Sequence, residues 1–438
     1  MGSSHEKLQL WGGIECTVNR VDDRYFDQLR YSGHHDRLSD LELIADIGVR
    51  VLRYPVIWER TEAQGGLDFA WSDGRLARLY ALGIEPIVGL VHHGSGPLHT
   101  SLVSSCFPEK LSAFAEQVAR RYPWLGLFTP VNEPLTTARF SGLYGHWHPH
   151  GKNDRTFVRA LLTQCKAIVL SMQAIRRVSA TAQLVQTEDM GFTRSTAGLR
   201  YQADFENERR WLSLDLLAGH VSRKHDLYDY LLAAGATERE LGFFLEHPCP
   251  PDIIGINYYV TSERFLDDRL RLYPAGLVGG NHRERYVDVE AVRVCAEGLL
   301  GPAASLSAAH LRYGRPVVIS EAHMACSVAQ QASWMRYVWN AALAARDRGA
   351  DVRAVTAWAL LGAYGWDRLV TRACGQYEPG ALSVVNGVPE RTLLASFLAR
   401  LASGELPEAE RGWWTTPERF IYEPHRSLAT DAARATAC

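Results

Sequence analysis

Two glutamates stand at the ends of two apolar, strand-like stretches of the sequence. Residues 127–134 end in the pair Asn132-Glu133 followed by a proline, and residues 316–323 deliver Glu321 in the same manner. Parallel α/β barrels place their chemistry at the carboxyl ends of the strands, so both carboxyl groups are expected to face one pocket. Two carboxyl groups in one pocket are the minimum requirement for cleaving a glycosidic bond, and this defines the first functional hypothesis.

The two carboxyl groups are expected to take different roles. A glycosidic oxygen leaves poorly unless it is protonated as the bond breaks, so one carboxyl group must keep its proton near neutral pH. Glu133 is the candidate acid/base, because it follows an apolar strand and a nearby Glu321 disfavours a second negative charge. Glu321 would attack the anomeric carbon as an ionised nucleophile. This predicts retention of configuration, with the carboxyl groups about 5–5.5 Å apart.

Eight apolar runs bounded by glycine, proline or polar residues are expected to form the strands that position these side chains. They are residues 8–14, 49–54, 84–91, 127–132, 182–186, 252–257, 316–321 and 352–358. Stretches with helical spacing of apolar residues separate them. This alternation predicts an α/β protein with a single (β/α)8 TIM barrel and long βα loops over residues 8–403, followed by a C-terminal tail at 404–438.

Three connections carry specific expectations. Residues 135–153 are expected to form an irregular active-site loop, which contains His146, His148 and His150. Alternating histidines can bind a metal ion, but Pro149 and the flanking glycines favour an irregular loop, so no metal site is expected. Residues 266–286 are expected to form a loop over one side of the pocket. Residues 288–300 are expected to be helical.

The composition excludes several classes of function. A formal net charge of −2 gives no reason to expect nucleic acid or an anionic membrane as a partner. The eight cysteines are irregularly spaced and form no C-x-x-C pair, which favours reduced thiols over a structural zinc site. No apolar run reaches the roughly 18 residues of a membrane span, and the polar N-terminus lacks a signal-peptide core. We therefore expect a cytoplasmic protein that acts on a small-molecule glycoside or oligosaccharide without a cofactor.

Taken together, the strand ends resemble family 1 glycoside hydrolases, the β-glucosidase-like (β/α)8 enzymes of clan A, over roughly residues 8–401. The motifs that carry the resemblance are Trp11-Gly12-Gly13, residues 52–58, residues 83–88 with His92, Asn132-Glu133-Pro134, residues 256–259, Glu321 and residues 357–361. Each motif is short and weak alone, whereas the complete set in this order is specific. The resemblance implies a retaining β-glycosidase with Glu133 as acid/base and Glu321 as nucleophile.

The resemblance also implies the surroundings of the nucleophile. Arg53 should lie close to Glu321 and keep it anionic, although a structural arginine on the barrel rim is the alternative. Tyr259 should hydrogen-bond to Glu321 and orient it, unless it is a core tyrosine. Asn132 should donate a hydrogen bond to the sugar 2-hydroxyl, a contact that strengthens in the transition state.

Further residues are implied to contact the sugar. His92 should contact the 3-hydroxyl, with a hydrogen-bonded rim histidine as the alternative. Trp358 should form the stacking floor for the sugar, with a buried packing role as the competing interpretation. Trp366 is a weaker candidate, because the residue before it differs from the family pattern. Glu15 and Asn19 lie just past the first strand. They are candidates to supply polar contacts to the sugar that other residues supply in the family.

The chain departs from the family pattern at three positions. Asn19 stands where the family usually has Gln, and His93 stands where it usually has Trp. Gly365 replaces the Glu that grips the 4- and 6-hydroxyls of glucose in the family. Losing a charged hydrogen bond worth about 1.5–3 kcal/mol should weaken glucose recognition about tenfold or more. The hypothesis is a 6-deoxy, amino or otherwise substituted sugar. Glu188 and Asp189 could also supply polar contacts, or could be structural partners at a strand end.

Residues 11–20 resemble a divergent bacterial branch, in which the glycosidase-like domain is often fused ahead of a reductase of the dTDP-4-dehydrorhamnose type. No Gly-rich dinucleotide fingerprint occurs near the C-terminus, so NAD(P) is not expected as a cofactor. The resemblance does imply a functional link to a nucleotide-sugar reductase of this type. Three alternatives stay open. They are a transglycosidase using the same glutamates, a non-catalytic sugar-binding partner of a nucleotide-sugar pathway, and a metal-dependent hydrolase using His92, His93 and residues 146–150.

Overall fold

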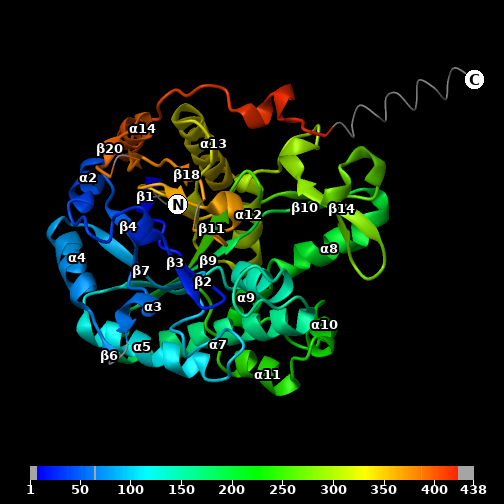
Figure 1. Cartoon of the computed structure of the whole chain (residues 1–438), viewed down its shortest axis with the longest axis horizontal. Coiled ribbons are helices and arrows are strands. Elements are labelled where there is room, and N and C mark those ends of the chain that lie inside the picture. The colour runs from blue at the N-terminus through cyan, green and yellow to red at the C-terminus, as the bar shows by residue number, and fades with distance from the viewer. Residues whose placement is uncertain (1–6, 64–65, 374, 386, 423–438) are drawn as a thin grey trace, which may run out of the picture.

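The computed structural model describes residues 7–63, 66–373, 375–385 and 387–422. Eight parallel strands form a closed barrel in the order β1-β4-β7-β8-β9-β11-β15-β16, which closes where β16 pairs with β1. Helices surround this barrel, as Figure 1 shows. The predicted α/β class and (β/α)8 barrel are therefore confirmed.

The barrel strands coincide with the predicted apolar runs to within a few residues. They are β1 (Gln9–Gly13), β4 (Val51–Pro55), β7 (Glu85–His92), β8 (Leu127–Asn132), β9 (Gln183–Asp189), β11 (Ile253–Tyr258), β15 (Val317–Ala322) and β16 (Val352–Ala357). β11 and β15 are buried along their whole length. Parallel strands covered on both faces require such continuous apolar runs, which is why the runs could be recognised in the sequence.

The helices of the outer ring follow the strands in alternation. They are α2 (Asp40–Asp46), α4 (Ala70–Ala81), α5 (Phe107–Arg121), α7 (Asp154–Val178), α12 (Pro302–Tyr313), α13 (Val328–Asp347) and α14 (Leu393–Ala402). Four shorter helices lie between β9 and β11: α8 (Arg200–Arg209), α9 (Leu212–Ala218), α10 (Tyr228–Ala233) and α11 (Glu238–Glu246).

Helix α7 is long and apolar enough to cross a membrane by length and composition alone. However, 78% of its most apolar 18-residue window is buried inside the protein. Asn153 caps the helix, because its side chain accepts a hydrogen bond from the backbone N–H of Thr156. The apolar composition of α7 is thus explained by its packing within the molecule.

The expectations about connections are wrong in part. Residues 266–286, expected to form a loop, contain β13 (Val278–Gly280) and the first residues of β14 (Arg285–Glu290). Residues 134–143, expected to be irregular, form the short helix α6 (Pro134–Ala138) and the π-helical turn η1 (Arg139–Leu143). Pro134 occupies the first turn of α6, where the fixed φ angle of proline favours a helix start. Glycines and a proline further along the segment led to the prediction of a loop throughout.

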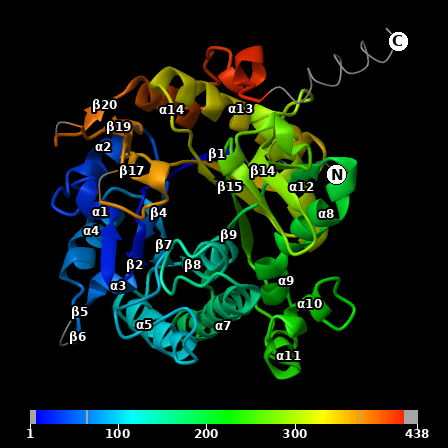
Figure 2. The same cartoon turned by 45° about the vertical axis from the view of Figure 1, so that its right-hand side comes forward.

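The helix expected at residues 288–300 is reduced to the single 3-10 turn η5 (Ala291–Arg293). Its beginning instead belongs to β14 (Arg285–Glu290), which pairs antiparallel with β12 (Arg264–Asp267) and β13 (Val278–Gly280). With β10 (Thr193–Ser195) these strands form a small separate sheet, and Figure 2 shows it beside α8 on one side of the barrel. Val287 and Val289 are buried while Asp288 between them is exposed, a period of two that a strand satisfies and a helix does not.

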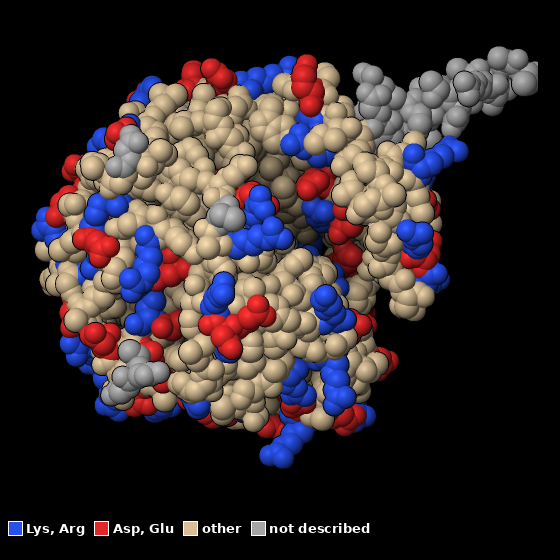
Figure 3. Space-filling model, viewed as in Figure 1, with Lys and Arg blue, Asp and Glu red and all other residues tan. Residues whose placement is uncertain are grey.

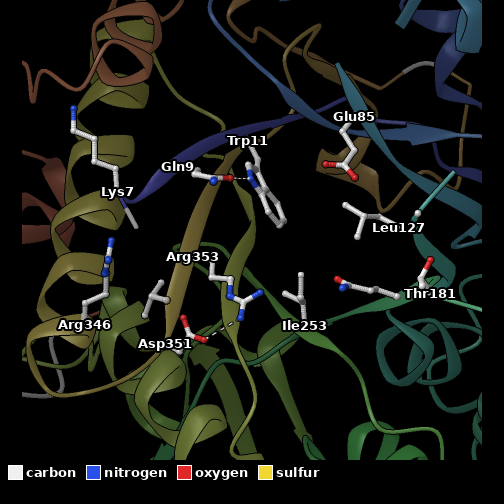
Figure 4. A pocket seen from close by; sticks show the side chains of 13 residues that line it. Lys7, Gln9, Trp11, Glu85, Leu127, Thr181, Ile253, Arg346, Asp351 and Arg353 are labelled. Carbon is white, nitrogen blue, oxygen red and sulfur yellow. Dashed lines mark hydrogen bonds and ion pairs between the residues drawn. The ribbon is translucent and has the colours of Figure 1, made fainter. Parts of the chain in front are cut away.

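The amino ends of the barrel strands enclose a cavity of about 670 Å³ (Figure 4). Its lining includes the first residues of several strands, among them Gln9, Glu85, Leu127 and Ile253. Trp11 points into this end of the barrel and donates a hydrogen bond from its indole N–H to Gln9. This cavity therefore lies at the barrel end opposite to Glu133 and Glu321, which follow the carboxyl ends of their strands.

The chain continues past α14 along the outside of the barrel. Trp414 is 4% exposed and meets the ring of Trp334 in α13 at a centroid distance of 5.0 Å. The segment after residue 403 thus contributes to the main hydrophobic core. The six cysteines in the described part of the chain are free thiols.

Replacing Trp414 by alanine should lower the free energy of unfolding by about 3–5 kcal/mol, because it leaves a cavity against Trp334. Denaturant-induced unfolding measures this loss. The control is Leu311→Ala in α12, whose side chain is 87% exposed and should cost less than about 0.5 kcal/mol. Equal losses for the two variants would contradict the packing of this segment on the barrel.

Candidate active site

Every barrel strand places a polar or aromatic side chain at the carboxyl end of the barrel. All are 5% exposed or less, and they are Glu15, Arg53, His92, Asn132, Glu133, Glu188, Asn257, Glu321 and Trp358. Figure 3 shows a hollow on the face seen in Figure 1, with acidic and basic side chains along it. The expected convergence of strand-end side chains is thus observed, and these side chains are almost entirely removed from bulk water.

Arg53 and Tyr259 hold the carboxylate of Glu321. Arg53 Nη1 lies 2.6 Å from Glu321 Oε1, and Tyr259 donates its hydroxyl hydrogen to Oε2. Burial raises the pKa of Glu321, whereas the positive charge of Arg53 and the hydrogen bond from Tyr259 oppose this rise. Both contacts favour the ionised form, which is the form that a nucleophile needs.

Glu133 has different surroundings. Asn257 Nδ2 donates a hydrogen bond of 2.5 Å to Glu133 Oε1, and His93 Nε2 lies 3.8 Å from Oε2. Burial raises the pKa of Glu133 well above its ordinary value, and the negative charge of Glu321 raises it further. The contact from Asn257 opposes this rise without bringing a positive charge. The surroundings of Glu133 therefore favour its protonated form, whereas Arg53 and Tyr259 favour the ionised form of Glu321.

The backbone at Glu133 is strained. Its φ of 45° and ψ of 62° lie in the left-handed region, which a non-glycine residue rarely adopts. The backbone N–H of Glu133 donates to the carbonyl of Thr187 on β9, and the next residue, Pro134, starts α6. The neighbouring strand and the helix start together stabilise this conformation, which turns the chain sharply at the end of β8.

Asn132 is positioned by Arg53 and by β9. Its Oδ1 accepts hydrogen bonds from Arg53 Nη2 at 2.6 Å and from Thr187 Oγ1 at 2.7 Å. Its Nδ2 therefore points away from Arg53 and lies 3.2 Å from His92 Nε2. His92 in turn stacks on Trp358, with ring centroids 5.5 Å apart. The predicted residues Arg53, His92, Asn132 and Trp358 thus form one connected group.

The two histidines after β7 are neutral. Burial, His93 and Arg53 lower the pKa of His92 well below its ordinary value. Burial and Arg53 lower the pKa of His93 to about 3. Within the described residues, no group of three or more His, Cys, Asp or Glu side chains is placed to hold a metal ion.

Glu15 and Trp366 are in direct contact, whereas Asn19 has a different partner. Trp366 Nε1 donates a hydrogen bond of 3.1 Å to Glu15 Oε2. Asn19 Nδ2 donates one of 3.0 Å to the carbonyl of Val370, so this amide group holds the loop after Trp366. Gly365 has a φ of 73°, which explains why glycine occupies this position.

Sequence reasoning overlooked the contact that Asn257 makes with Glu133. In the sequence, Asn257 is part of the sixth-strand motif. Its position at the end of that strand indicates that it lies at the same end of the barrel as Glu133. Trp147 was also missed. It is buried, lies 5.3 Å from His93 by ring centroid, and donates its indole N–H to the carbonyl of Leu369.

Replacing Asn257 by alanine should raise the pKa of Glu133 further, because it removes a hydrogen bond to the charged form of the carboxyl group. Titration of ¹³C-labelled glutamate carboxyl groups by NMR measures this change. Ser320→Ala is the matched control, since Ser320 donates to Asn257 Oδ1 at 2.5 Å and is not hydrogen-bonded to Glu133. A pKa of Glu133 that falls in the Asn257 variant would contradict this assignment.

Comparison with known proteins gives distant relatives. No protein-family model matches the sequence. Beta-glucosidase 4 of Oryza sativa subsp. japonica is 23% identical over 419 residues, which cover 84% of each chain. The beta-glucosidase from Thermotoga maritima in complex with cyclophellitol superposes with a TM-score of 0.70 at 16% identity, covering 86% of this chain and 88% of that one.

A second structure of the Thermotoga maritima beta-glucosidase, in complex with a calystegine derivative, gives a TM-score of 0.74 at 15% identity. The match covers 92% of this chain and 99% of that chain. A third is described as a family 1 β-glucosidase and gives a TM-score of 0.69. The fold of this chain is therefore that of the family 1 β-glucosidases.

Proposed function

We propose that the protein is a retaining β-glycosidase that uses Glu321 as the nucleophile and Glu133 as the acid/base. The observation that carries this proposal is that the two carboxyl groups have neighbours of different charge. Glu321 receives a cation and a hydroxyl hydrogen, whereas Glu133 is buried beside that negative charge with a neutral amide as its closest partner. Two carboxyl groups whose pKa values are pushed apart are suited to one acid and one nucleophile.

In the first step, the carboxylate of Glu321 attacks the anomeric carbon. The bond from this carbon to the glycosidic oxygen breaks, and Glu133 transfers its proton to that oxygen. The products are a glycosyl ester of Glu321, a free alcohol and an ionised Glu133. Tyr259 keeps the attacking carboxylate oriented through its hydroxyl hydrogen.

The second step reverses these roles. Ionised Glu133 takes a proton from water, the water oxygen bonds to the anomeric carbon, and the ester bond to Glu321 breaks. Esterification removes the negative charge of Glu321, which is one of the causes that raise the pKa of Glu133. The pKa of Glu133 therefore falls as the intermediate forms, so that the same group becomes a usable base.

The other polar side chains position the sugar. Asn132 presents Nδ2 to the 2-hydroxyl, because its Oδ1 is already held by Arg53 and Thr187. His92 contacts the 3-hydroxyl, and the indole rings of Trp358 and Trp366 contact the sugar ring. The distant similarity to a rice beta-glucosidase supports the β-configured substrate. The Thermotoga maritima beta-glucosidase forms complexes with cyclophellitol and deoxynojirimycin, which supports a sugar-sized ligand.

A 2-deoxy-2-fluoro β-glycoside with a good leaving group should trap the covalent intermediate on Glu321. The fluorine slows both steps, while the activated leaving group preserves the first. Peptide mass mapping should locate the label on Glu321, and Glu321→Gln should lose on the order of 10⁴-fold or more in kcat/KM. Transfer of the sugar to an added acceptor instead of water would identify a transglycosidase. A label on another residue would refute the assignment.

Glu133→Gln should lose far more activity on alkyl glycosides than on nitrophenyl glycosides. An alkoxide needs protonation as it leaves, worth about 10²–10⁴-fold, whereas nitrophenolate does not. The measurement compares kcat/KM for both substrates in the variant and the wild type. An equal loss on both substrates would contradict the role of Glu133 as the acid.

Arg53→Gln should move the acidic limb of the pH profile of kcat/KM to higher pH. Arg53 stabilises the ionised form of Glu321, so removing this charge raises the pKa of the nucleophile, which must be ionised to react. Arg121→Gln is a control, because Arg121 pairs with Asp73 in α4. An acidic limb that stays in place or moves to lower pH would contradict this account of Arg53.

A further inference from the structure

Glu15 is a buried carboxyl group whose partners are all neutral. It is 4% exposed, its Oε1 accepts the backbone N–H of Thr17 at 2.9 Å, and its Oε2 accepts the indole N–H of Trp366 at 3.1 Å. Trp358 also lies beside it. Across the described residues, no Lys, Arg or His side chain forms an ion pair with Glu15. A buried charge without a counter-charge is costly, so this arrangement calls for an explanation.

The cost of burying the other carboxyl groups of the site is reduced in different ways. Glu321 is paired with Arg53, and burial together with the charge of Glu321 raises the pKa of Glu133 well above its ordinary value. Burial raises the pKa of Glu188 to about 8, so this group is largely neutral at pH 7. His92 and His93 are neutral and supply no positive charge. Burial also raises the pKa of Glu15, and the hydrogen bonds that oppose this rise come from Thr17, Trp366 and Trp358, none of which brings a positive charge.

Glu15 lies at the same end of the barrel as Glu133 and Glu321, beside Trp358 and Trp366. Its negative charge is one of the causes that raise the pKa of Glu321 and of Tyr259. Its hydrogen-bond donor Trp366 and its neighbour Trp358 are the two indoles assigned to the sugar ring. Glu15 follows β1, which pairs with both β16 and β4. Trp358 directly follows β16, and Arg53 lies in β4.

Asn19 adds a second acceptor on this side of the site. Its Oδ1 is buried and has no hydrogen-bond partner, while its Nδ2 is committed to the carbonyl of Val370. That carbonyl belongs to the loop that also carries Trp366. The segment after β1 thus offers a carboxyl group and an amide oxygen. Its one cation, Arg20, donates instead to Asp23 and to the carbonyls of Asp22, Leu98 and Thr100.

We propose that Glu15 binds a protonated amino group on the sugar, so that the preferred substrates are β-glycosides of amino sugars. This proposal rests on the proposed glycosidase function and names its substrate class. An ammonium group supplies the missing positive charge together with three hydrogen-bond donors. A neutral hydroxyl group supplies one donor and no charge, so it would leave the buried carboxylate uncompensated.

The experiment measures kcat/KM for nitrophenyl β-glucoside and for its four amino-deoxy analogues, substituted at position 2, 3, 4 or 6. At least one analogue should exceed both the glucoside and its own acetamido derivative by on the order of 10- to 100-fold, the effect of a charge-assisted hydrogen bond. The acetamido derivative keeps the nitrogen but removes the charge. If wild-type protein prefers the glucoside to all four amines, the proposal is wrong, and this outcome requires no variant.

Glu15→Gln should reduce the preference for the amine over the glucoside to about one, since the amide keeps the size of the side chain and loses its charge. Glu188→Gln is the matched control and should retain the preference, because it removes a different buried carboxyl group of the same barrel end. A preference that survives Glu15→Gln would overturn the assignment of the charge to Glu15.

Calorimetric titration with the methyl β-glycosides of the same sugars separates this proposal from the proposed function. If no glycoside is hydrolysed, the glycosidase proposal fails. Tighter binding of an amino glycoside than of methyl β-glucoside, lost in Glu15→Gln, would still support the amino-group site. Equal binding of the amino and neutral glycosides would refute it whether or not hydrolysis occurs.

Discussion

The contact of Arg53 with both Glu321 and Asn132 is the interaction on which the rest of the site depends. It joins β4, β8 and β15, and β15 is adjacent to neither of the other two in the barrel. The guanidinium group therefore spans the interior of the barrel, and its partners meet only once the sheet has closed. Removing one member of a buried charge pair leaves an uncompensated charge, which is strongly destabilising. Closure of the barrel and assembly of the site are thus linked.

The two glutamates have the same chemistry, and their neighbours make them different. One receives a guanidinium and a phenol, and the other receives an amide and a nearby negative charge. Burial strengthens both effects, because a low local dielectric increases the interaction between charges. The difference in proton affinity is therefore a property of the assembled pocket, and it disappears when the strands separate.

The site also concentrates features that reduce stability. Glu133 and His93 adopt positive φ angles, and buried acceptor atoms without partners occur on Asn19, Glu188 and Asp189. Strain and unpaired polar atoms persist where the surrounding structure holds them in place. Those at the carboxyl end of the barrel, near Glu133 and Glu321, are consistent with a site prepared for a polar ligand.

The sequence by itself determined the barrel and the end at which its polar site residues lie. Buried parallel strands require continuous apolar runs, and the polar residues that follow each run can be recognised from the local sequence. Tertiary structure alone decided the strand pairing of residues 285–290, whose β-conformation depends on partners elsewhere in the chain. It also decided the contact between Asn257 and Glu133, which are separated by 124 positions and meet because only β9 lies between β8 and β11 in the sheet. The proton affinities, including the raised pKa of Glu15, likewise follow from burial, a quantity that exists only in the folded chain.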